Sequence, residues 1–175
     1  MIVVAVVGSK KSGKTTVIEI LTRELTKRGY RVATVKHVPE LNFTIDAEGK
    51  DTWRFARSGA KTIVAISSDE IAVVEKTKTT KHTLETVLQK SKKSDVVFVE
   101  GFKDVLARNK DVHKIVIVDS AQEALEAVKS YQNIMVFAGS YSTDNLRTGI
   151  PHVNISKNPE NVVDMIEKIM MKKPL

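Results

Sequence analysis

The feature that most constrains this chain is a glycine- and lysine-rich segment near its start, GSKKSGKT at residues 8–15. The segment fits the pattern G-x-x-x-x-G-K-[ST] in full. It lies between an apolar run, Ile2–Val7, and a helix that the spacing of apolar residues predicts from Thr15 to Arg28. Glycines let the backbone curl so that successive N–H groups face phosphate oxygens, and the helix adds its positive N-terminal dipole. The sequence therefore predicts a strand, a phosphate-binding loop and a helix, in that order.

Two side chains of this phosphate loop, residues 8–15, have predicted roles. Lys14 is placed to reach the β- and γ-phosphates of a nucleotide, which makes it a candidate catalytic residue. The Thr15 hydroxyl is placed to ligate Mg²⁺. The rest of the loop is expected to wrap the phosphates with its backbone, through Gly8, Ser9, Ser12 and Gly13.

Short β-branched runs recur along the chain and alternate with helical stretches. Near-continuous apolar runs are typical of strands that are covered on both faces. The runs are IVVAVV, YRVATV, KTIVAI, EIAVVE, DVVFVE, HKIVIV and NIMVFA. This alternation predicts an α/β fold with a doubly wound, mostly parallel sheet. KTIVAI and EIAVVE are separated by only SSD, too short for a crossover, so an antiparallel hairpin is expected near residues 61–75.

Two further stretches predict helices. Ser120 and Glu123 form a capping-box pattern ahead of ALEAVKS. Trp53, Phe55 and Ala56 have the spacing of a helix that buries its apolar face.

Length and composition bound the remaining possibilities. A chain of 175 residues with 42% hydrophobic residues is expected to form one domain over residues 1–175. No apolar run approaches the roughly 20 residues of a membrane span, and the first run is too short for a signal-peptide core. The absence of cysteine excludes disulfides and thiolate metal sites, so a cytoplasmic protein is expected.

A second candidate site element is the strand DVVFVE, which ends at Glu100. A hydrophobic strand that ends in an acidic residue has the form of a Walker B element, whose carboxylate holds Mg²⁺ or a water bound to it. Ligands of open α/β sheets gather at the carboxyl ends of the strands, so Glu100 is expected to point toward the phosphate loop as a catalytic and metal-binding residue.

A polar loop follows the second apolar run. Its chemistry-bearing residues are Lys36, His37, Asp46, Gly49, Lys50, Asp51, Thr52 and Arg54. Such a loop at the carboxyl end of a strand is a place for substrate or switch residues, but its composition also suits an ordinary surface loop. His37 has no second histidine at metal-ligand spacing, so zinc is not expected.

Two other features resemble functional motifs but favour simpler interpretations. Asn109–Asp111 resembles a guanine-reading N-K-x-D motif, but its aspartate comes one residue early and the triplet precedes a strand. The basic run from Lys76 to His82 and the net charge of +7 suit anionic partners, including nucleic acid. With only 5% aromatic residues to stack on bases, a solvated surface is favoured over nucleic-acid binding.

Taken together, these residues resemble the molybdopterin-guanine dinucleotide biosynthesis adapter family (MobB). The resemblance covers residues 2 to about 103. It rests on GSKKSGKTT, on VKH at residues 35–37, on the D-x-x-GKDT-x-R block from Asp46 to Arg54, on SGA at residues 58–60 and on VEGFK at residues 99–103.

The resemblance implies a GTP-binding protein, typically a homodimer, that assists the guanylyltransferase attaching GMP to molybdopterin. It implies that Lys14, Thr15 and Thr16 hold phosphate and Mg²⁺, and that Glu100 is the acidic metal partner. It also implies that His37, Asp46 and Asp51 line the nucleotide site. A preference for GTP over ATP comes from this resemblance alone. The motifs supply a cradle and a metal ligand but no obvious arginine finger, so weak Mg²⁺-dependent GTP hydrolysis is expected.

Two alternatives remain open at this point. A small-molecule kinase uses the same phosphate loop and acidic strand end, although Arg54 and Arg57 are the only near pair of arginines that could serve a lid. A nucleotide-driven switch that binds nucleic acid is the other, and its binding to DNA or RNA would depend steeply on salt.

Overall fold

In the computed structural model of the chain, the first apolar run forms a central strand of a six-stranded sheet. The strand order is β2-β5-β1-β6-β7-β8, and every neighbouring pair is parallel. The strands are β1 (Ile2–Val7), β2 (Val32–Lys36), β5 (Val96–Glu100), β6 (His113–Ile117), β7 (Ile134–Ala138) and β8 (His152–Val153). Five of the expected runs form five of these strands, with the expected parallel pairing. No pattern predicted the sixth strand, β8.

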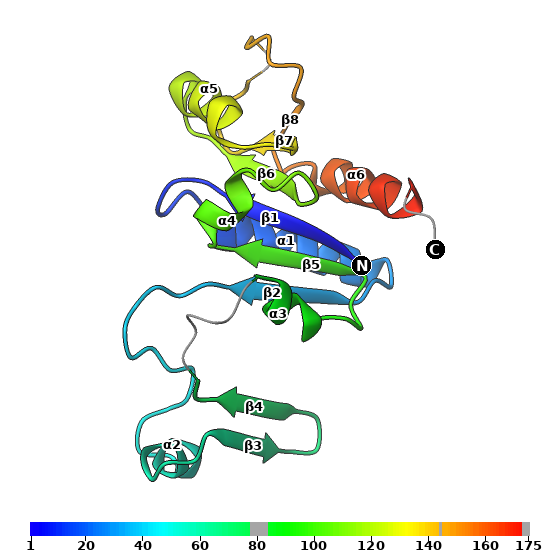
Figure 1. The fold of residues 1–175 in the computed structure, drawn as a ribbon. Helices are drawn as coiled ribbons and strands as arrows, with labels where there is room; N and C mark the ends of the chain where they lie inside the picture. The colour runs from blue at the N-terminus through cyan, green and yellow to red at the C-terminus, as the bar shows by residue number, and fades with distance from the viewer. Residues whose placement is uncertain (78–83, 144, 173–175) are drawn as a thin grey trace. The chain divides into compact units, whose positions relative to one another are not determined.

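Helices cover both faces of the sheet (Figure 1). Val4 and Val6 of β1 are in an apolar cluster with residues of α1 (Lys14–Lys27) and α6 (Pro159–Lys172). Ala5 and Val7 are in a second cluster with residues of α3 (Leu84–Gln89), α4 (Lys103–Ala107) and α5 (Ala121–Ser130). This alternation follows from the two-residue period of a strand. It confirms the expected doubly wound α/β fold.

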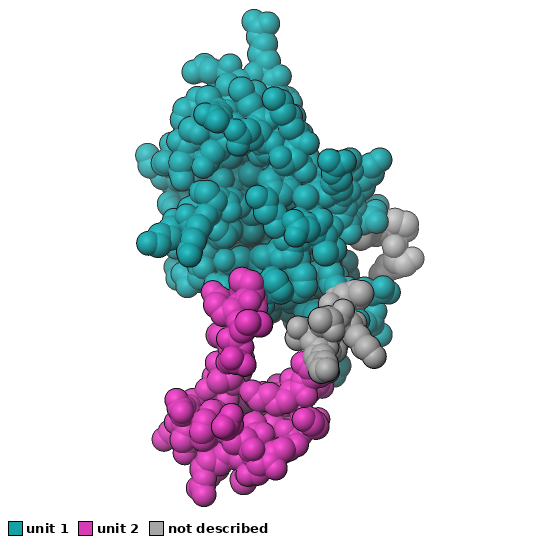
Figure 2. Space-filling model, turned by 60° about the vertical axis from the view of Figure 1, so that its left-hand side comes forward, with its two compact units in different colours: residues 1–37, 84–175 teal, residues 38–83 magenta. Residues whose placement is uncertain are grey.

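The structure describes residues 1–77, 84–143 and 145–172, which divide into two compact units (Figure 2). The first unit, residues 1–37 and 84–175, contains the parallel sheet. The second unit, residues 38–83, contains α2 (Asp51–Arg57), β3 (Thr62–Ile66) and β4 (Ile71–Glu75). The two strands pair antiparallel, which confirms the hairpin expected near residues 61–75. The assignment of the whole chain to one domain stays a prediction.

The expectation that α2 buries its apolar face is wrong. The Phe55 side chain is 57% exposed, and no residue of this helix is buried. Trp53 is half-buried, with the Arg57 guanidinium 5.7 Å from the centroid of its ring. The physical reason is size: a helix of seven residues beside a two-stranded sheet has too little apolar surface to enclose it. The basic run expected to be a solvated surface lies largely outside the described residues, since it includes residues 78–82.

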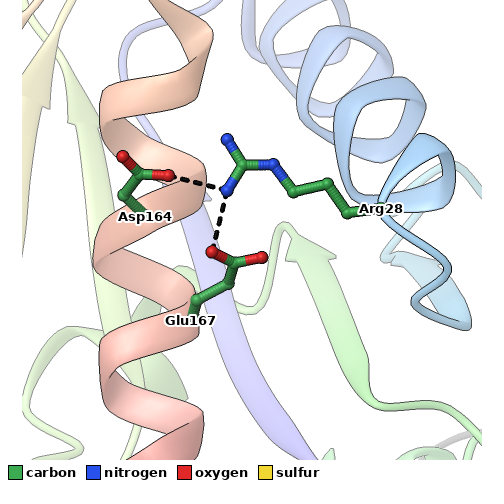
Figure 3. A network of polar contacts seen from close by, with 3 residues as sticks. All are labelled: Arg28, Asp164 and Glu167. Atoms are coloured by element: carbon green, nitrogen blue, oxygen red, sulfur yellow. Dashed lines mark hydrogen bonds and ion pairs between the residues drawn. The ribbon is translucent and has the colours of Figure 1, made fainter.

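Polar contacts fix the strand and helix ends of the first unit. Arg28, directly after α1, donates through Nη1 to Asp164 Oδ1 at 2.6 Å and to Glu167 Oε2 at 2.8 Å, and so joins α1 to α6 (Figure 3). Arg31 donates to the Asp95 carboxylate through Nη2, Nε and its backbone N–H, and this pair joins the starts of β2 and β5. The side-chain and backbone hydrogen bonds from Arg31 lower the pKa of Asp95 to about 2. Within the described residues, no helix is both long and apolar enough to span a membrane.

Candidate functional site

The phosphate loop joins the carboxyl end of β1 to the amino end of α1, as its motif predicts. Gly13, the residue before α1, has φ 87°, a left-handed conformation that glycine adopts without strain. Gly13 is the N-cap residue of α1, and it has no side chain that could accept a hydrogen bond from the N–H groups of the first turn. The N–H groups of that turn are therefore left for another acceptor, and an anion such as a phosphate is a suitable one.

Gly8 permits a close approach within the loop. A Cβ atom at this position would lie 2.6 Å from Ser12 Oγ and 3.0 Å from the carbonyl oxygen of Ile117. A side chain here would push the loop away from β6, so glycine is required sterically. Ser12 Oγ is buried and has no hydrogen-bond partner among the described residues. A buried hydroxyl without a partner is costly, and a phosphate oxygen would supply its missing partner.

The Lys14 ammonium lies across this loop. Its Nζ donates to the carbonyl oxygens of Ser9 at 2.5 Å and Gly8 at 3.3 Å. An ammonium group has three protons to donate and can turn toward phosphate oxygens while its stem stays in place. The geometry thus holds one positive charge over the loop that the sequence predicts to bind phosphate.

The structure brings Thr15 and Glu100 together, as the sequence predicts. The Thr15 hydroxyl lies 3.4 Å from Glu100 Oε2, to which it donates, and the Lys36 ammonium lies 3.6 Å from the same oxygen. The Glu100 side chain is only 16% exposed. A half-buried carboxylate beside a hydroxyl and an ammonium can accept a cation in place of the ammonium.

The Thr15 hydroxyl and the Glu100 carboxylate suit Mg²⁺ that is bound together with a nucleotide better than they suit a metal ion held by protein ligands alone. Mg²⁺ takes oxygen ligands, and in nucleotide sites it is bound by one or two protein groups with phosphates and waters. The described residues contain no group of three or more His, Cys, Asp or Glu side chains placed to hold a metal ion. A hydroxyl and one carboxylate at the edge of the phosphate loop therefore suit a metal that arrives with a nucleotide.

His37 lies at the same end of the sheet as Glu100. Its backbone N–H donates to the Glu100 carbonyl oxygen at 2.9 Å, and its ring lies 4.7 Å from the ring of Phe102, measured between centroids. Gly101 has φ 93°, and a Cβ atom there would lie 2.7 Å from His37 Cβ. The close approach of these two backbones fixes the ends of β2 and β5 side by side.

Asp46 and Asp51 belong to the second unit, where they lie around the start of α2. Thr52 Oγ1 donates to Asp46 Oδ1 at 2.8 Å, and Arg54 Nη1 lies 3.5 Å from Asp51 Oδ1. Asp46 Oδ2 is buried without a hydrogen-bond partner among the described residues. The D-x-x-GKDT-x-R block thus forms a local polar network, and its role at a nucleotide stays a prediction.

The discounted triplet Asn109–Asp111 forms a turn at the amino end of β6. Asn109 Oδ1 accepts hydrogen bonds from the backbone N–H groups of Asp111 and Val112. Because β6 is parallel to β1, this turn lies at the opposite end of the sheet from the phosphate loop. The turn has a structural role there.

Sequence patterns missed a group of residues that lines a cavity next to the phosphate loop. Thr16, which the resemblance places at the phosphates, is among the lining residues. The lining residues that no pattern predicted include Asp119, Ser140 and Asn154, which come from the carboxyl ends of β6, β7 and β8. No motif marks them. For Asp119 and Ser140, the available signal was their position after the apolar runs HKIVIV and NIMVFA, because the carboxyl ends of parallel strands meet at one edge. Asn154 follows no such run.

One family model and several known proteins are similar to this chain in sequence. The family model described as molybdopterin guanine dinucleotide synthesis protein B matches residues 3–140. A molybdopterin-guanine dinucleotide biosynthesis adapter protein of Haemophilus influenzae is 37% identical over 101 residues, which is 56% of this chain and 55% of the relative. A putative adapter protein of the same description from Methanocaldococcus jannaschii is 30% identical over 149 residues, 83% of this chain and 59% of the relative. The matches thus span little more than half the length of these two relatives.

A solved structure shares the fold. The crystal structure of Bacillus subtilis MobB aligns with a TM-score of 0.75 at 23% identity, covering 96% of this chain and 97% of that one. At this identity, the likeness supports the fold assignment alone.

Proposed function

Because this chain belongs to the molybdopterin guanine dinucleotide synthesis protein B family, we propose that it is a GTP-binding adapter and slow Mg²⁺-dependent GTPase. It would assist the attachment of GMP to molybdopterin in molybdenum cofactor biosynthesis. Its partners would be the guanylyltransferase and the molybdopterin precursor, and its location the cytoplasm. The family assignment favours this function over the alternative of a small-molecule kinase.

The observation that carries the proposal is the pairing of the phosphate loop with the Thr15–Glu100 contact of 3.4 Å. Bound Mg²⁺ would supply positive charge at the β- and γ-phosphates. Lys14 would donate to the same phosphates, and the first turn of α1 would hold them through its N–H groups. Slow hydrolysis is expected, because in this class a further arginine often comes from a partner protein and accelerates the reaction.

Each predicted site residue has a place in this proposal. The phosphates would be held by the loop and the start of α1, namely Gly8, Ser9, Ser12, Gly13, Lys14, Thr15 and Thr16. Mg²⁺ would be held by Thr15 and by Glu100, directly or through water. His37, Asp46 and Asp51 would line the nucleotide site.

The nucleotide proposal can be tested by a thermal-shift panel of GTP, GDP, ATP and ADP on the full chain, with and without Mg²⁺. A ligand at 100 times its Kd stabilises the folded state by about 2.7 kcal/mol, which in a chain of this length raises Tm by roughly 5–10 °C. We expect the largest shift with Mg²⁺ and GTP. Equal shifts with ATP and GTP would contradict the guanine preference. Transfer of the γ-phosphate to a small acceptor, instead of to water, would favour the kinase.

The hairpin supports the proposal of a homodimer. Val64 pairs with Val73 and Ile66 with Ile71, so all four side chains lie on one face of β3–β4. That face leaves Ile66 74% exposed and Ile71 68% exposed. A contiguous and exposed apolar face of this kind is typical of a protein–protein interface.

The double variant Ile66→Thr/Ile71→Thr is expected to weaken the dimer. Threonine keeps the β-branched shape and the cross-strand pair, so the hairpin should persist while its exposed face loses apolar area. If part of the roughly 1.5–3 kcal/mol per buried isoleucine is lost, the dimer dissociation constant rises at least roughly tenfold. Sedimentation velocity over a concentration series measures this constant. Ser68→Thr in the hairpin turn is the matched control, and an unchanged constant in the double variant would place the dimer contact elsewhere.

A further inference from the structure

A cavity of about 420 Å³ adjoins the phosphate loop at the carboxyl end of the parallel sheet. This volume lies within the range of about 300–1,000 Å³ that is usual for small-molecule sites. Its walls come from the loop and the start of α1, from the end of β6 and from the ends of β7 and β8. Its residues near the loop are Ser12, Gly13, Thr16 and Val17.

The positions of Thr15 and Glu100 indicate which part of a nucleotide would bind in this cavity. Glu100 ends β5, which pairs with β1 on one side, whereas β6, β7 and β8 lie on the other side of β1. A metal at Thr15 and Glu100 would bind the β- and γ-phosphates. The α-phosphate and the nucleoside must then extend away from Glu100. The cavity on the β6 side, which Thr16 lines directly after the metal-binding threonine, is in that direction.

Asp119 provides the one carboxylate among the residues described as lining this cavity. Its backbone N–H donates to Glu123 Oε2 at 2.8 Å, and Ser120 Oγ accepts from the Glu123 N–H at 3.2 Å. These capping contacts fix Asp119 at the start of α5. Ser140 Oγ, from the loop after β7, donates to Asp119 Oδ1 at 3.4 Å. Contacts from α5 and from the loop after β7 therefore hold Asp119 in the lining of the cavity.

Gly139 allows the β7 end to come close enough for this contact. It has φ 120°, and a Cβ atom there would lie 2.4 Å from the carbonyl oxygen of Val118. Because glycine has no Cβ atom, the backbone at the end of β7 can lie directly against the end of β6, and no other residue fits there. This close approach places Asp119 and Ser140 in one wall of the cavity.

We propose that this cavity is the subsite for a guanine nucleoside and that Asp119 selects the base. The proposal rests on the proposed function, in which the phosphate loop binds a nucleoside triphosphate. A carboxylate presents acceptors only, and the Watson–Crick edge of guanine presents two adjacent donors, N1–H and the N2 amine. Adenine presents an acceptor at N1, which the carboxylate disfavours. Asn154 and Lys157, from the end of β8, provide donors that suit guanine O6.

The variant Asp119→Asn tests the subsite through a change of base preference. Xanthine has a carbonyl group in place of the N2 amine of guanine, and the asparagine amide can donate to it. We expect the variant to bind GTP about 10- to 100-fold more weakly than the unaltered chain, because charge-assisted hydrogen bonds contribute roughly 1.5–3 kcal/mol. We expect it to gain affinity for xanthosine triphosphate by a similar factor. Isothermal titration of the full chain with GTP, xanthosine triphosphate and ATP, all with Mg²⁺, measures both changes.

Asp111→Asn is the matched control, because Asp111 is an exposed aspartate before the amino end of the same strand, β6. It should leave all three affinities unchanged. If Asp119→Asn binds GTP like the unaltered chain, or loses GTP without gaining xanthosine triphosphate, the subsite is wrong while the proposed function stands. If the unaltered chain binds GTP and ATP equally, base selection by Asp119 is also overturned. If it binds no nucleotide at all, the proposed function itself fails, and the subsite with it.

Discussion

Replacing Lys14 by alanine is expected to weaken the binding of Mg²⁺–GTP by at least roughly 100-fold while the fold is kept. Hydrogen bonds to charged groups contribute about 1.5–3 kcal/mol each, and Lys14 is proposed to make two, one to the β- and one to the γ-phosphate. Their loss corresponds to roughly 10²–10⁴ in Kd. The fold should tolerate the change, because among the described residues the Lys14 ammonium donates only to carbonyl oxygens of its own loop, those of Gly8 and Ser9.

Lys10→Ala is the matched control for this experiment. Lys10 carries the same charge in the same loop, and its side chain is exposed. If the ammonium of Lys14 acts by position, Lys10→Ala should change the Kd for Mg²⁺–GTP less than about threefold. Titration calorimetry measures the Kd, and thermal unfolding without nucleotide checks the fold. Equal losses in the two variants would mean that the loop attracts phosphate only through its overall charge.

The strands of this fold could be predicted because buried parallel strands consist of near-continuous apolar runs. DVVFVE and HKIVIV correspond to β5 and β6, which are buried along most of their length. The missed strand, β8, has only two residues, His152–Val153, and so it has no periodicity to detect. The five residues of α4, Lys103–Ala107, are likewise too few for a helical repeat.

The candidate site was predictable where a short motif carries its own chemistry. The phosphate loop needs glycine at Gly8 because of a close approach and at Gly13 because of its left-handed backbone. Both glycines belong to the motif, so the sequence alone indicates them. Asp119 was visible only as a residue ahead of a helix cap, because its position beside the loop depends on the contact between the ends of β6 and β7. That contact joins residues distant in sequence, and no local pattern encodes it.

Glu100→Gln is expected to remove most of the contribution of Mg²⁺ to nucleotide binding. Glutamine keeps the shape and can still accept from the Thr15 hydroxyl, so the variant removes charge and little else. If Glu100 holds the metal through water, its loss is expected to cost about 10- to 100-fold in metal affinity, the usual effect of losing an outer-shell partner. The Kd for GTP should therefore rise toward its value in EDTA, and titrations with and without Mg²⁺ measure this difference.

Lys36→Met should have the opposite effect, and the pair of variants tests the proposed role of Glu100. The Lys36 ammonium lies 3.6 Å from Glu100 Oε2, the position in which it competes with a cation. Its side chain is 60% exposed, so this ion pair contributes only roughly 0.2–1 kcal/mol, and its removal should raise the affinity for Mg²⁺ by up to about fivefold. If the Lys36–Glu100 ion pair were purely structural, both variants would instead lower the free energy of unfolding and leave the Mg²⁺ dependence of nucleotide binding unchanged. Opposite changes in Mg²⁺ affinity would thus show that Glu100 acts on the metal, because loss of a structural contact cannot raise affinity in one variant and lower it in the other.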